Sequence, residues 1–504
     1  YVNSEKMSEV LVTREGMTTG NNELFLRLWH EVDVNKINRK WFPYNKGGEY
    51  RKWYGNDEYL VNWENDGAAI KNFKDKKTGR VRSHNYNGEY AFKEGITWSA
   101  FSSRGATFRY SDAHFLFDSK GSKGFCCKEL VPYILAFLNS SVGEKYLSYF
   151  AGAKDKKPGH IIALPYRYSE KYYDSIVELA RCCIEIEKEE WDSHEISWNF
   201  EENILVKNNT DGSISTAVTN SIDHWKSRFE EIKTSEEKIN SMFIEVFNVG
   251  SEICSQISEM DITINIPNKN DLVQEFISYA VGCMFGRYSL DNVGLICAGG
   301  KWNELQYNKF EPDRDAIIPI CDDEYFADDI VSRFVTFTEV VFGKECLEDN
   351  LQFISSVLKG KGTSREIIRN YFLNDFYAYH TKMYRKAPIY WLVESGKKNG
   401  FKCLIYMHRY QPDTIARIRT DYVHEQQARY RTAIEEMTNR LEGVSGSEKV
   451  KLTKKLNMLK AQNDEIHVFE EKIHHLADQM ISIDLDDGVK KNYEIFKDVL
   501  AKIK

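Results

Sequence analysis

Lysine and arginine side chains alternate with aromatic residues and glycines between Lys36 and Lys128. This window holds 18 Lys/Arg against 10 Asp/Glu, an excess of +8 in a chain whose formal net charge is -8. It also contains four tryptophans, namely Trp41, Trp53, Trp63 and Trp98. Cations bind phosphates and aromatic rings stack on bases, so a local excess of both indicates a nucleic-acid-binding surface. Aromatic residues are more often core than surface, and Trp53, which stands between cations and a glycine in RKWYGN, is the one we expect to be exposed.

Three segments in a fixed order carry a family resemblance. They are GMTTGNNELFLRLWHEV, the Trp-rich KWFPYNKGGEYRKWYGN, and APIYWLVESGKKNGFKCLIYMHRYQPDTIARI. From about residue 12 to about residue 430, the chain closely resembles the PglX family, the adenine-specific DNA methyltransferases of BREX phage-defence systems. The resemblance implies methyl transfer from S-adenosylmethionine to the N6 of an adenine in double-stranded DNA, and other BREX components as partners. Ten cysteines in a chain of this length indicate a reduced, cytoplasmic location.

The catalytic motifs of such an enzyme are missing from the sequence. A methyltransferase acting on an adenine amino group needs an Asn/Asp-Pro-Pro-Tyr/Phe loop, and no two of the nine prolines are adjacent. The single Gly-x-Gly, at 360–362, fits a helix C-cap followed by an N-cap at Thr363 or Ser364 better than a cofactor turn. The chain also begins at Tyr1 without a methionine. We therefore expect a target-recognition region without catalytic or cofactor-binding residues, with S-adenosylmethionine bound by an N-terminal half that is absent here.

The resemblance assigns DNA reading to the Trp-rich window. Phosphate contacts are expected from Lys46, Arg51, Lys52, Lys93, Arg104 and Arg109. Base edges would be read by Asn65, Thr97, Ser99, Ser102 and Arg104. Gly47 and Gly48 would let the backbone approach a phosphate, and Trp53 would face the DNA. Lys397 and Lys398, on a hairpin further along, would either add contacts with the DNA backbone or simply solvate that hairpin.

The predicted fold class is α+β, with a mixed, mainly β recognition domain, largely helical regions, a β-hairpin and a long C-terminal helical hairpin. We divide the chain into a junction (1–35), a target-recognition domain (36–170), a helical connector and linker (171–224), a mixed α/β domain (225–412) and a helical hairpin (413–504).

Periodicity and turn residues predict the individual elements. Expected helices are ELFLRLWHEV, with Leu24, Leu28 and Val32 on one stripe, residues 131–150, a solvated acidic helix within 169–203, and 414–442 with 447–481 as an antiparallel pair. KPGHIIALPY predicts a strand, and residues 206–225 predict an exposed loop or linker. PIYWLV and FKCLIYM, joined by SGKKNG, predict a β-hairpin.

Other chemistries have weaker support. Asp322, Asp323, Glu324, Asp328 and Asp329 could hold Mg²⁺ in a nuclease, but no PD-x-(D/E)xK string accompanies them. The vicinal pairs Cys126-Cys127 and Cys182-Cys183 lack zinc-ligand spacing, so we expect no metal site. No apolar run is long enough to cross a membrane.

Two further interpretations stay open. The chain could serve as a scaffold or interaction module of a defence complex, through its C-terminal helical hairpin. A phage-encoded DNA mimic could also occupy the same basic surface, because such a protein presents negative charge as DNA does.

Overall fold

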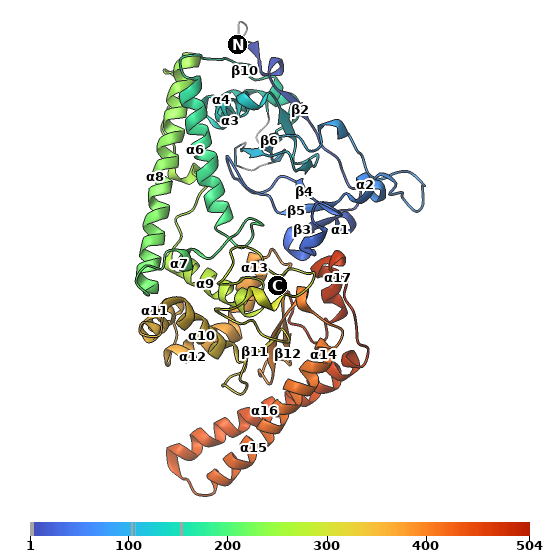
Figure 1. The fold of residues 1–504 in the computed structure, drawn as a ribbon, viewed down its shortest axis with the longest axis vertical. Helices are drawn as coiled ribbons and strands as arrows, with labels where there is room; N and C mark the ends of the chain where they lie inside the picture. Colours follow the sequence, from blue (N-terminus) through green and yellow to red (C-terminus); the bar gives the residue numbers. More distant parts are fainter. Residues whose placement is uncertain (1–4, 102–103, 106, 152–154, 504) are drawn as a thin grey trace. The chain divides into compact units, whose positions relative to one another are not determined.

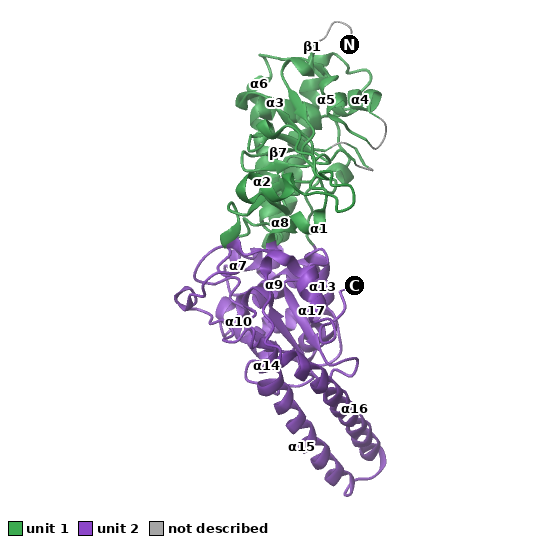
Figure 2. Cartoon of the chain, turned by 90° about the vertical axis from the view of Figure 1, so that its right-hand side faces the viewer, with its two compact units in different colours: residues 1–29, 35–200, 220–267 green, residues 30–34, 201–219, 268–504 purple. Residues whose placement is uncertain are grey.

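The computed structural model describes residues 5–101, 104–105, 107–151 and 155–503. The chain forms two compact units, unit 1 with residues 1–29, 35–200 and 220–267, and unit 2 with residues 30–34, 201–219 and 268–504 (Figure 2). Long helices accompany several small, mostly antiparallel sheets, which confirms the predicted α+β class (Figure 1).

Unit 1 contains two four-stranded sheets and a two-stranded one. The first sheet has the antiparallel order β2-β9-β6-β7, and the second has the order β3-β5-β4-β8, in which only the β4–β8 pair is parallel. Its strands are β1 (Glu5–Lys6), β2 (Val12–Arg14), β3 (Leu26–Leu28), β4 (Trp41–Asn45), β5 (Tyr59–Asn62), β6 (Gly95–Trp98), β7 (Phe108–Ser111), β8 (Leu116–Phe117), β9 (Lys123–Phe125) and β10 (Pro165–Tyr166). Its helices are α1 (Asn22–Phe25), α2 (Glu64–Lys71), α3 (Val131–Asn139), α4 (Ser141–Phe150), α5 (Pro158–Ile162), α6 (Tyr173–Asp192) and most of α8 (Ile214–Phe247).

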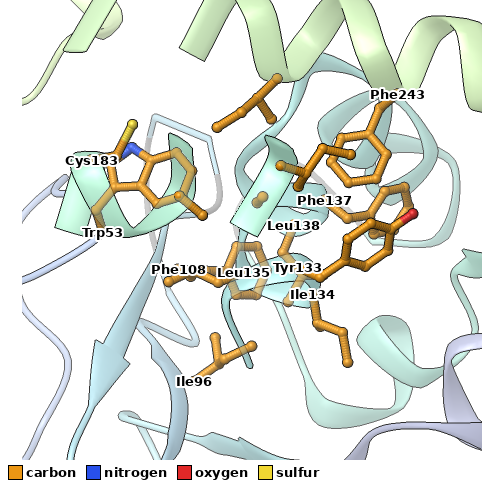
Figure 3. Packing of buried hydrophobic residues seen from close by; sticks show 14 of the residues in the cluster. Trp53, Ile96, Phe108, Tyr133, Ile134, Leu135, Phe137, Leu138, Cys183 and Phe243 are labelled. Atoms are coloured by element: carbon orange, nitrogen blue, oxygen red, sulfur yellow. The ribbon is translucent and has the colours of Figure 1, made fainter. Parts of the chain in front are cut away.

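The core of unit 1 is built around α3, which is apolar on every side. All of its residues from Val131 to Leu138 are buried, as expected for a helix without a polar face. Phe108 of β7 belongs to the same buried cluster, as do Cys183 of α6 and Phe243 of α8 (Figure 3). This packing joins the β2-β9-β6-β7 sheet to the long helices. The predicted helical region at 131–150 is confirmed, with a break at Ser140, whose side chain caps α4.

Three predicted elements in the first half of the chain are wrong. ELFLRLWHEV does not form one helix, because the alternation of Leu26 and Leu28 pairs as β3 with β5 and leaves Leu24 exposed. KPGHIIALPY forms the short helix α5 before the two residues of β10. The linker predicted at 206–225 becomes helix from Ile214 onward, since Ile214, Ala217, Val218 and Trp225 form a buried stripe that the Ser/Thr/Asn content obscures.

Unit 2 combines a three-stranded antiparallel sheet, of order β11-β13-β12, with helices. Its elements are α7 (Ile204–Lys207), α9 (Lys269–Met284), β11 (Ile317–Pro319), α10 (Ile330–Phe342), α11 (Leu347–Leu358), α12 (Ser364–Asn374), α13 (Phe376–Met383), β12 (Tyr390–Glu394), β13 (Lys402–Tyr406), α14 (Thr414–Arg417), α15 (His424–Leu441), α16 (Gly446–Ala477) and α17 (Gly488–Ile495). The β12–β13 hairpin confirms the prediction from turn chemistry. Thr363 is the N-cap of α12 and forms a capping box with Glu366, which confirms the predicted N-cap. The C-cap of α11 is Lys359, one residue before the Gly-x-Gly segment, so that part of the prediction is wrong by one position.

The C-terminal helical hairpin is also confirmed. α15 and α16 run antiparallel around a turn at 442–445, and His424 contacts Glu470 while Gln427 contacts His467 (Figure 1). One face of α16 is buried, including Leu459, Ile466 and Phe469. A π-helical turn at Ile418–Val423 precedes α15.

Candidate nucleic-acid interface

The tryptophans of the basic window lie inside unit 1. Trp41, Trp53 and Trp98 are each at most 1% exposed and Trp63 is 9% exposed. The prediction that Trp53 faces the DNA is therefore wrong. Its ring belongs to the core cluster around α3, and its Nε1–H donates a hydrogen bond of 2.6 Å to Glu236 of α8. The ring satisfies its polar group within the protein, as buried tryptophans usually do.

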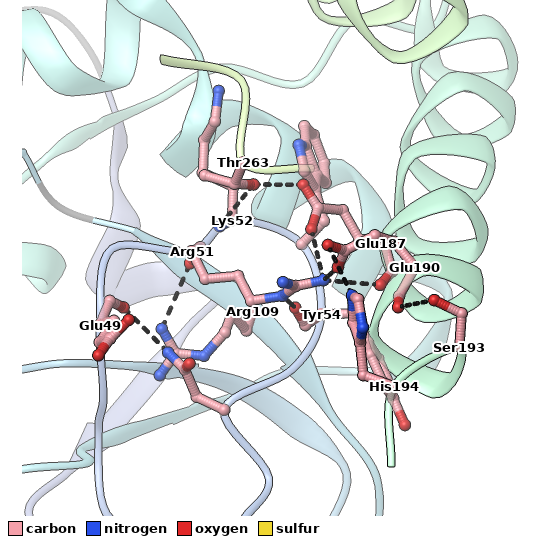
Figure 4. A network of polar contacts seen from close by, with 12 residues as sticks. Glu49, Arg51, Lys52, Tyr54, Arg109, Glu187, Glu190, Ser193, His194 and Thr263 are labelled. Carbon is pink, nitrogen blue, oxygen red and sulfur yellow. Dashed lines mark hydrogen bonds and ion pairs between the residues drawn. The ribbon is translucent and has the colours of Figure 1, made fainter. Parts of the chain in front are cut away.

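Arg51 is buried against α6 instead of being available to a phosphate (Figure 4). Its guanidinium lies 2.6 Å from the carboxylate of Glu190 and 3.0 Å from that of Glu187, and it donates to the backbone oxygens of Glu187 and Tyr54. Burial alone would raise the pKa of Glu190, but Arg51 and His194 lower it to about 2. Burial raises the pKa of Glu187 to about 8. The acidic helix α6, which we expected to be solvated, thus contributes two buried acids, Glu187 and Glu190, that hold the guanidinium of Arg51.

Lys52 makes a second buried ion pair, with Glu236 of α8. Its backbone N–H donates to Thr263, whose hydroxyl donates to Glu187 (Figure 4). A buried charge is tolerated only when it is paired. Here the ammonium of Lys52 and the carboxylate of Glu236 neutralise each other. The side chains of Arg51 and Lys52 join the β-rich part of unit 1 to α6 and α8, which gives them a structural role in place of the predicted phosphate contacts.

Several other predicted contacts also point inward. Arg109 is 1% exposed and its Nη1 lies 3.4 Å from the backbone oxygen of Arg51. Thr97 is buried and donates to the carbonyl of Ser122 at 3.2 Å. Ser99 is buried, and its hydroxyl donates to the carbonyl of Gly48 and accepts from its N–H. These hydrogen bonds give Arg109, Thr97 and Ser99 internal roles that do not fit the predicted contacts with DNA.

The glycine pair makes room for the protein itself. A Cβ on Gly48 would lie 2.6 Å from Cγ of Asn56, and one on Gly47, where φ is +85°, would lie 3.1 Å from the carbonyl oxygen of Lys120. Both glycines are needed for this turn to pack against its neighbours. The predicted approach to a phosphate is not required to explain them.

Four predicted residues of unit 1 keep accessible atoms. Asn65, Lys93 and Arg104 are exposed, and Lys46 is half-buried with its ammonium 4.8 Å from the centre of the Tyr59 ring. The guanidinium of Arg104 lies 5.1 Å from the ring of Tyr50, and the ammonium of Lys93 lies 5.1 Å from that of Tyr90. Burial lowers the pKa of Lys46. Ser102 lies outside the described residues.

A group of exposed cations beyond α2 was not singled out from the sequence. Residues 72–82, which we call the basic hairpin, form a short antiparallel turn with Lys74 opposite Val81. Figure 1 shows the chain after α2 as a projecting loop. Its exposed cations are Lys74, Lys76, Lys77, Arg80 and Arg82. The segment KDKKTGRVR carries a signal that could have identified it, because charge density coincides with the turn residues Thr78 and Gly79.

The hairpin of unit 2 presents the remaining candidates. Lys397 and Lys398 are exposed at its turn. The turn is held by Glu465 of α16, whose carboxylate accepts from the hydroxyl of Ser395 at 2.8 Å and from the N–H groups of Lys398 and Gly400 at 2.8 and 3.0 Å. The backbone is thereby fixed while the two ammonium groups remain accessible.

The acidic cluster of unit 2 has structural partners. Asp329 caps α10 and forms a bidentate ion pair with Arg369, at 2.7 and 2.9 Å. Asp328 accepts a hydrogen bond of 2.6 Å from Tyr422. Among the described residues, no group of three or more His, Cys, Asp or Glu is placed to hold a metal ion. No helix in the described part of the chain is both long and apolar enough to cross a membrane.

The chain is similar to known proteins over nearly its whole length. It is 40% identical, over 97% of its residues, to an adenine-specific methyltransferase PglX of Lacticaseibacillus casei (strain Zhang), of which it covers 42%. It is 37% identical, over 100% of its residues, to an adenine-specific methyltransferase BrxX of Escherichia coli O9:H4 (strain HS), of which it covers 44%. The chain thus spans less than half the length of these curated relatives. No protein-family model matches it.

Proposed function

We propose that this chain, a member of the PglX family of adenine-specific methyltransferases, is the DNA target-recognition portion of such an enzyme. It would bind duplex DNA and position a flipped adenine for methyl transfer from S-adenosylmethionine. The observation that carries the proposal is a match along the whole chain to methyltransferases, in a sequence that has no adjacent prolines for the catalytic loop. The chain alone would therefore be inactive, and a catalytic part would supply the cofactor pocket.

The exposed groups of unit 1 support a role in binding DNA. Asn65 and Arg104 are the proposed readers of base edges, and Lys93 and Lys46 are the proposed phosphate contacts, because their side chains keep accessible atoms. Lys397 and Lys398 of unit 2 are further candidates for backbone contacts. The phosphate contacts would make affinity fall as the salt concentration rises.

Fluorescence anisotropy with a labelled duplex, measured over a salt series, tests the proposal. We expect the purified chain to bind, with a negative slope of log affinity against log salt. A second measurement incubates the chain with S-adenosylmethionine and duplex DNA and looks for N6-methyladenine. Absence of binding to any duplex at low salt, or methylation by this chain alone, would contradict the proposed division of labour.

A role in protein assembly is favoured by α16. Val450 and Val468 are 69% and 57% exposed on this helix, and Met458 is also exposed. Because 18 residues make five helical turns, Val450 and Val468 lie on the same side of α16, where another protein would contact them. Other components of a BREX system are the proposed partners, and an acidic phage DNA mimic is a proposed competitor of DNA. Pull-down with variants in which Val450 and Val468 are replaced by Ser would test the binding of BREX components. Competition between an acidic DNA mimic and labelled duplex would test whether the mimic binds the same surface as DNA.

A further inference from the structure

We propose that the basic hairpin is a preformed clamp that binds the phosphate backbone of duplex DNA without reading its sequence. The inference rests on the proposed function, since it names the element of unit 1 that supplies nonspecific affinity. It departs from the sequence-based prediction, which placed these contacts around Arg51 and Lys52, where the structure has buried ion pairs.

The charge of the basic hairpin is unbalanced and accessible. Five exposed cations stand against one acid, Asp75, within residues 72–82, so its formal charge is +4. Arg82 lies over the ring of Phe73 at 5.7 Å, which steadies its guanidinium while leaving it exposed. A projecting element with this charge density has the electrostatic character of a phosphate-binding surface.

Asp75 holds the turn that presents these cations. Its Oδ1 accepts from the N–H groups of Lys77 and Thr78, at 3.0 and 2.9 Å, and from the Thr78 hydroxyl at 3.1 Å. These hydrogen bonds, led by that from Thr78, lower the pKa of Asp75. Two backbone hydrogen bonds close the turn, from Asp75 N–H to the Arg80 carbonyl at 2.8 Å and from Gly79 N–H to the Asp75 carbonyl at 2.9 Å. Gly79 has φ +71°, a conformation that favours glycine.

The base of the hairpin is fixed to the rest of unit 1. The buried hydroxyl of Ser83 donates to the carbonyl of Ile70 at 2.7 Å, and Thr18 and His84 exchange two backbone hydrogen bonds, at 2.8 and 3.1 Å. The cations are therefore presented on an ordered scaffold, so little conformational entropy is lost when they bind.

The side chains of the hairpin suit phosphates better than bases. Three of its five cations, Lys74, Lys76 and Lys77, are lysines, whose mobile point charges suit phosphates, and the guanidinium of Arg82 lies over the ring of Phe73. The one amide of the segment, on Asn72, donates to the carbonyl of Ala68 at 2.9 Å. The clamp would set affinity and register, and leave sequence preference to other residues.

A charge-matched comparison tests the clamp. One variant carries Lys76→Gln, Lys77→Gln and Arg80→Gln; the control carries Lys344→Gln, Lys361→Gln and Lys382→Gln, which remove three exposed cations from unit 2. For the hairpin variant, we expect the slope of log affinity against log salt to fall in magnitude by about 2 to 3, since each lost phosphate contact removes about 0.9. The loss should be equal for two duplexes of unrelated sequence, and the control slope should not change.

The outcomes separate the two proposals. If the unaltered chain binds no duplex, the proposed function itself is refuted. If the chain binds and the hairpin variant keeps its slope, or loses no more than the control, only the clamp is refuted. Circular dichroism melts should be the same for all three proteins, because every substituted side chain is exposed.

Asp75→Ala distinguishes a preformed clamp from a simple patch of charge. Removal of an acid from a basic surface would tighten DNA binding if only net charge mattered. If the turn must be held in place, loss of three hydrogen bonds to the carboxylate should weaken binding severalfold. Tighter or unchanged binding would overturn the preformed clamp.

Discussion

The buried pair of Lys52 and Glu236 gives a double-mutant cycle with a clear expectation. Both side chains are at most 7% exposed, and Glu236 also accepts the hydrogen bond from Trp53. Removing one partner of a buried ion pair typically costs about 3–5 kcal/mol, because the other charge stays buried and unpaired. Lys52→Met leaves the carboxylate alone, and Glu236→Gln leaves the ammonium alone. Each single substitution should lower the free energy of unfolding of unit 1 by about 3 kcal/mol or more.

The double variant should recover most of this loss. With Lys52→Met and Glu236→Gln together, no charge remains, and the amide oxygen can still accept from Trp53. We expect stability within about 1 kcal/mol of the unaltered chain, as for other buried pairs replaced by neutral groups of similar volume. Urea unfolding followed by tryptophan fluorescence measures all four proteins. If the cost of the double variant equals the sum of the two single costs, the pair is not coupled and the reasoning fails.

Three further predictions follow from buried or exposed groups. Burial, with the charge of Arg287, lowers the pKa of both His380 and His408 to about 3, whereas the unfolded chain protonates near pH 6.5. The free energy of unfolding should therefore be unaffected by these rings above about pH 6.5 and fall by about 1.4 kcal/mol per pH unit for each ring between pH 6.5 and pH 3. Urea unfolding at pH 7.5 and 5.5 measures this change, and equal stability at the two pH values would contradict it. Gly48→Ala should cost about 1–3 kcal/mol, because its Cβ would lie 2.6 Å from Cγ of Asn56, and an unchanged melting temperature would contradict this. Arg104→Ala in the complete enzyme should weaken DNA binding by about 1–3 kcal/mol and relax the base preference at one position of the DNA site. Sequencing of methylated sites measures that preference, and an unchanged pattern of sites would show that Arg104 does not read a base.

Local patterns predicted elements whose partners are near in sequence. The β12–β13 hairpin, the α15–α16 pair and an N-cap at Thr363 or Ser364 were all predicted, because turn residues, capping residues and 3.6-residue periodicity are local properties. The segment ELFLRLWHEV was predicted as a helix and is partly strand, since pairing with β5 overrode its helical stripe. α8 begins within a segment that was predicted as a linker. The helix was missed because its buried apolar residues are sparse among polar ones.

The structure separates the residues of the predicted DNA-binding region into exposed and buried ones. Arg104, Lys93 and Asn65 are exposed as DNA contacts require, while Trp53 and Arg51 are buried. The basic hairpin was inside the predicted window, yet its residues were not distinguished from cations that face inward. Charge alone does not reveal whether a side chain points to solvent or to the interior. A lysine or arginine beside a tryptophan can lie on the surface or form a buried ion pair.

The sequence by itself determined the α+β class, the family resemblance, the local turns and the excess of positive charge between Lys36 and Lys128. Only the tertiary structure decided which of these cations remain available. The acids that hold Arg51 and Lys52 lie 139 and 184 residues further along the chain, and no local pattern relates positions so far apart. Burial of a charge requires such a partner, so the long-range packing of α6 and α8 against the Trp-rich stretch sorts its cations into internal ion pairs and exposed groups.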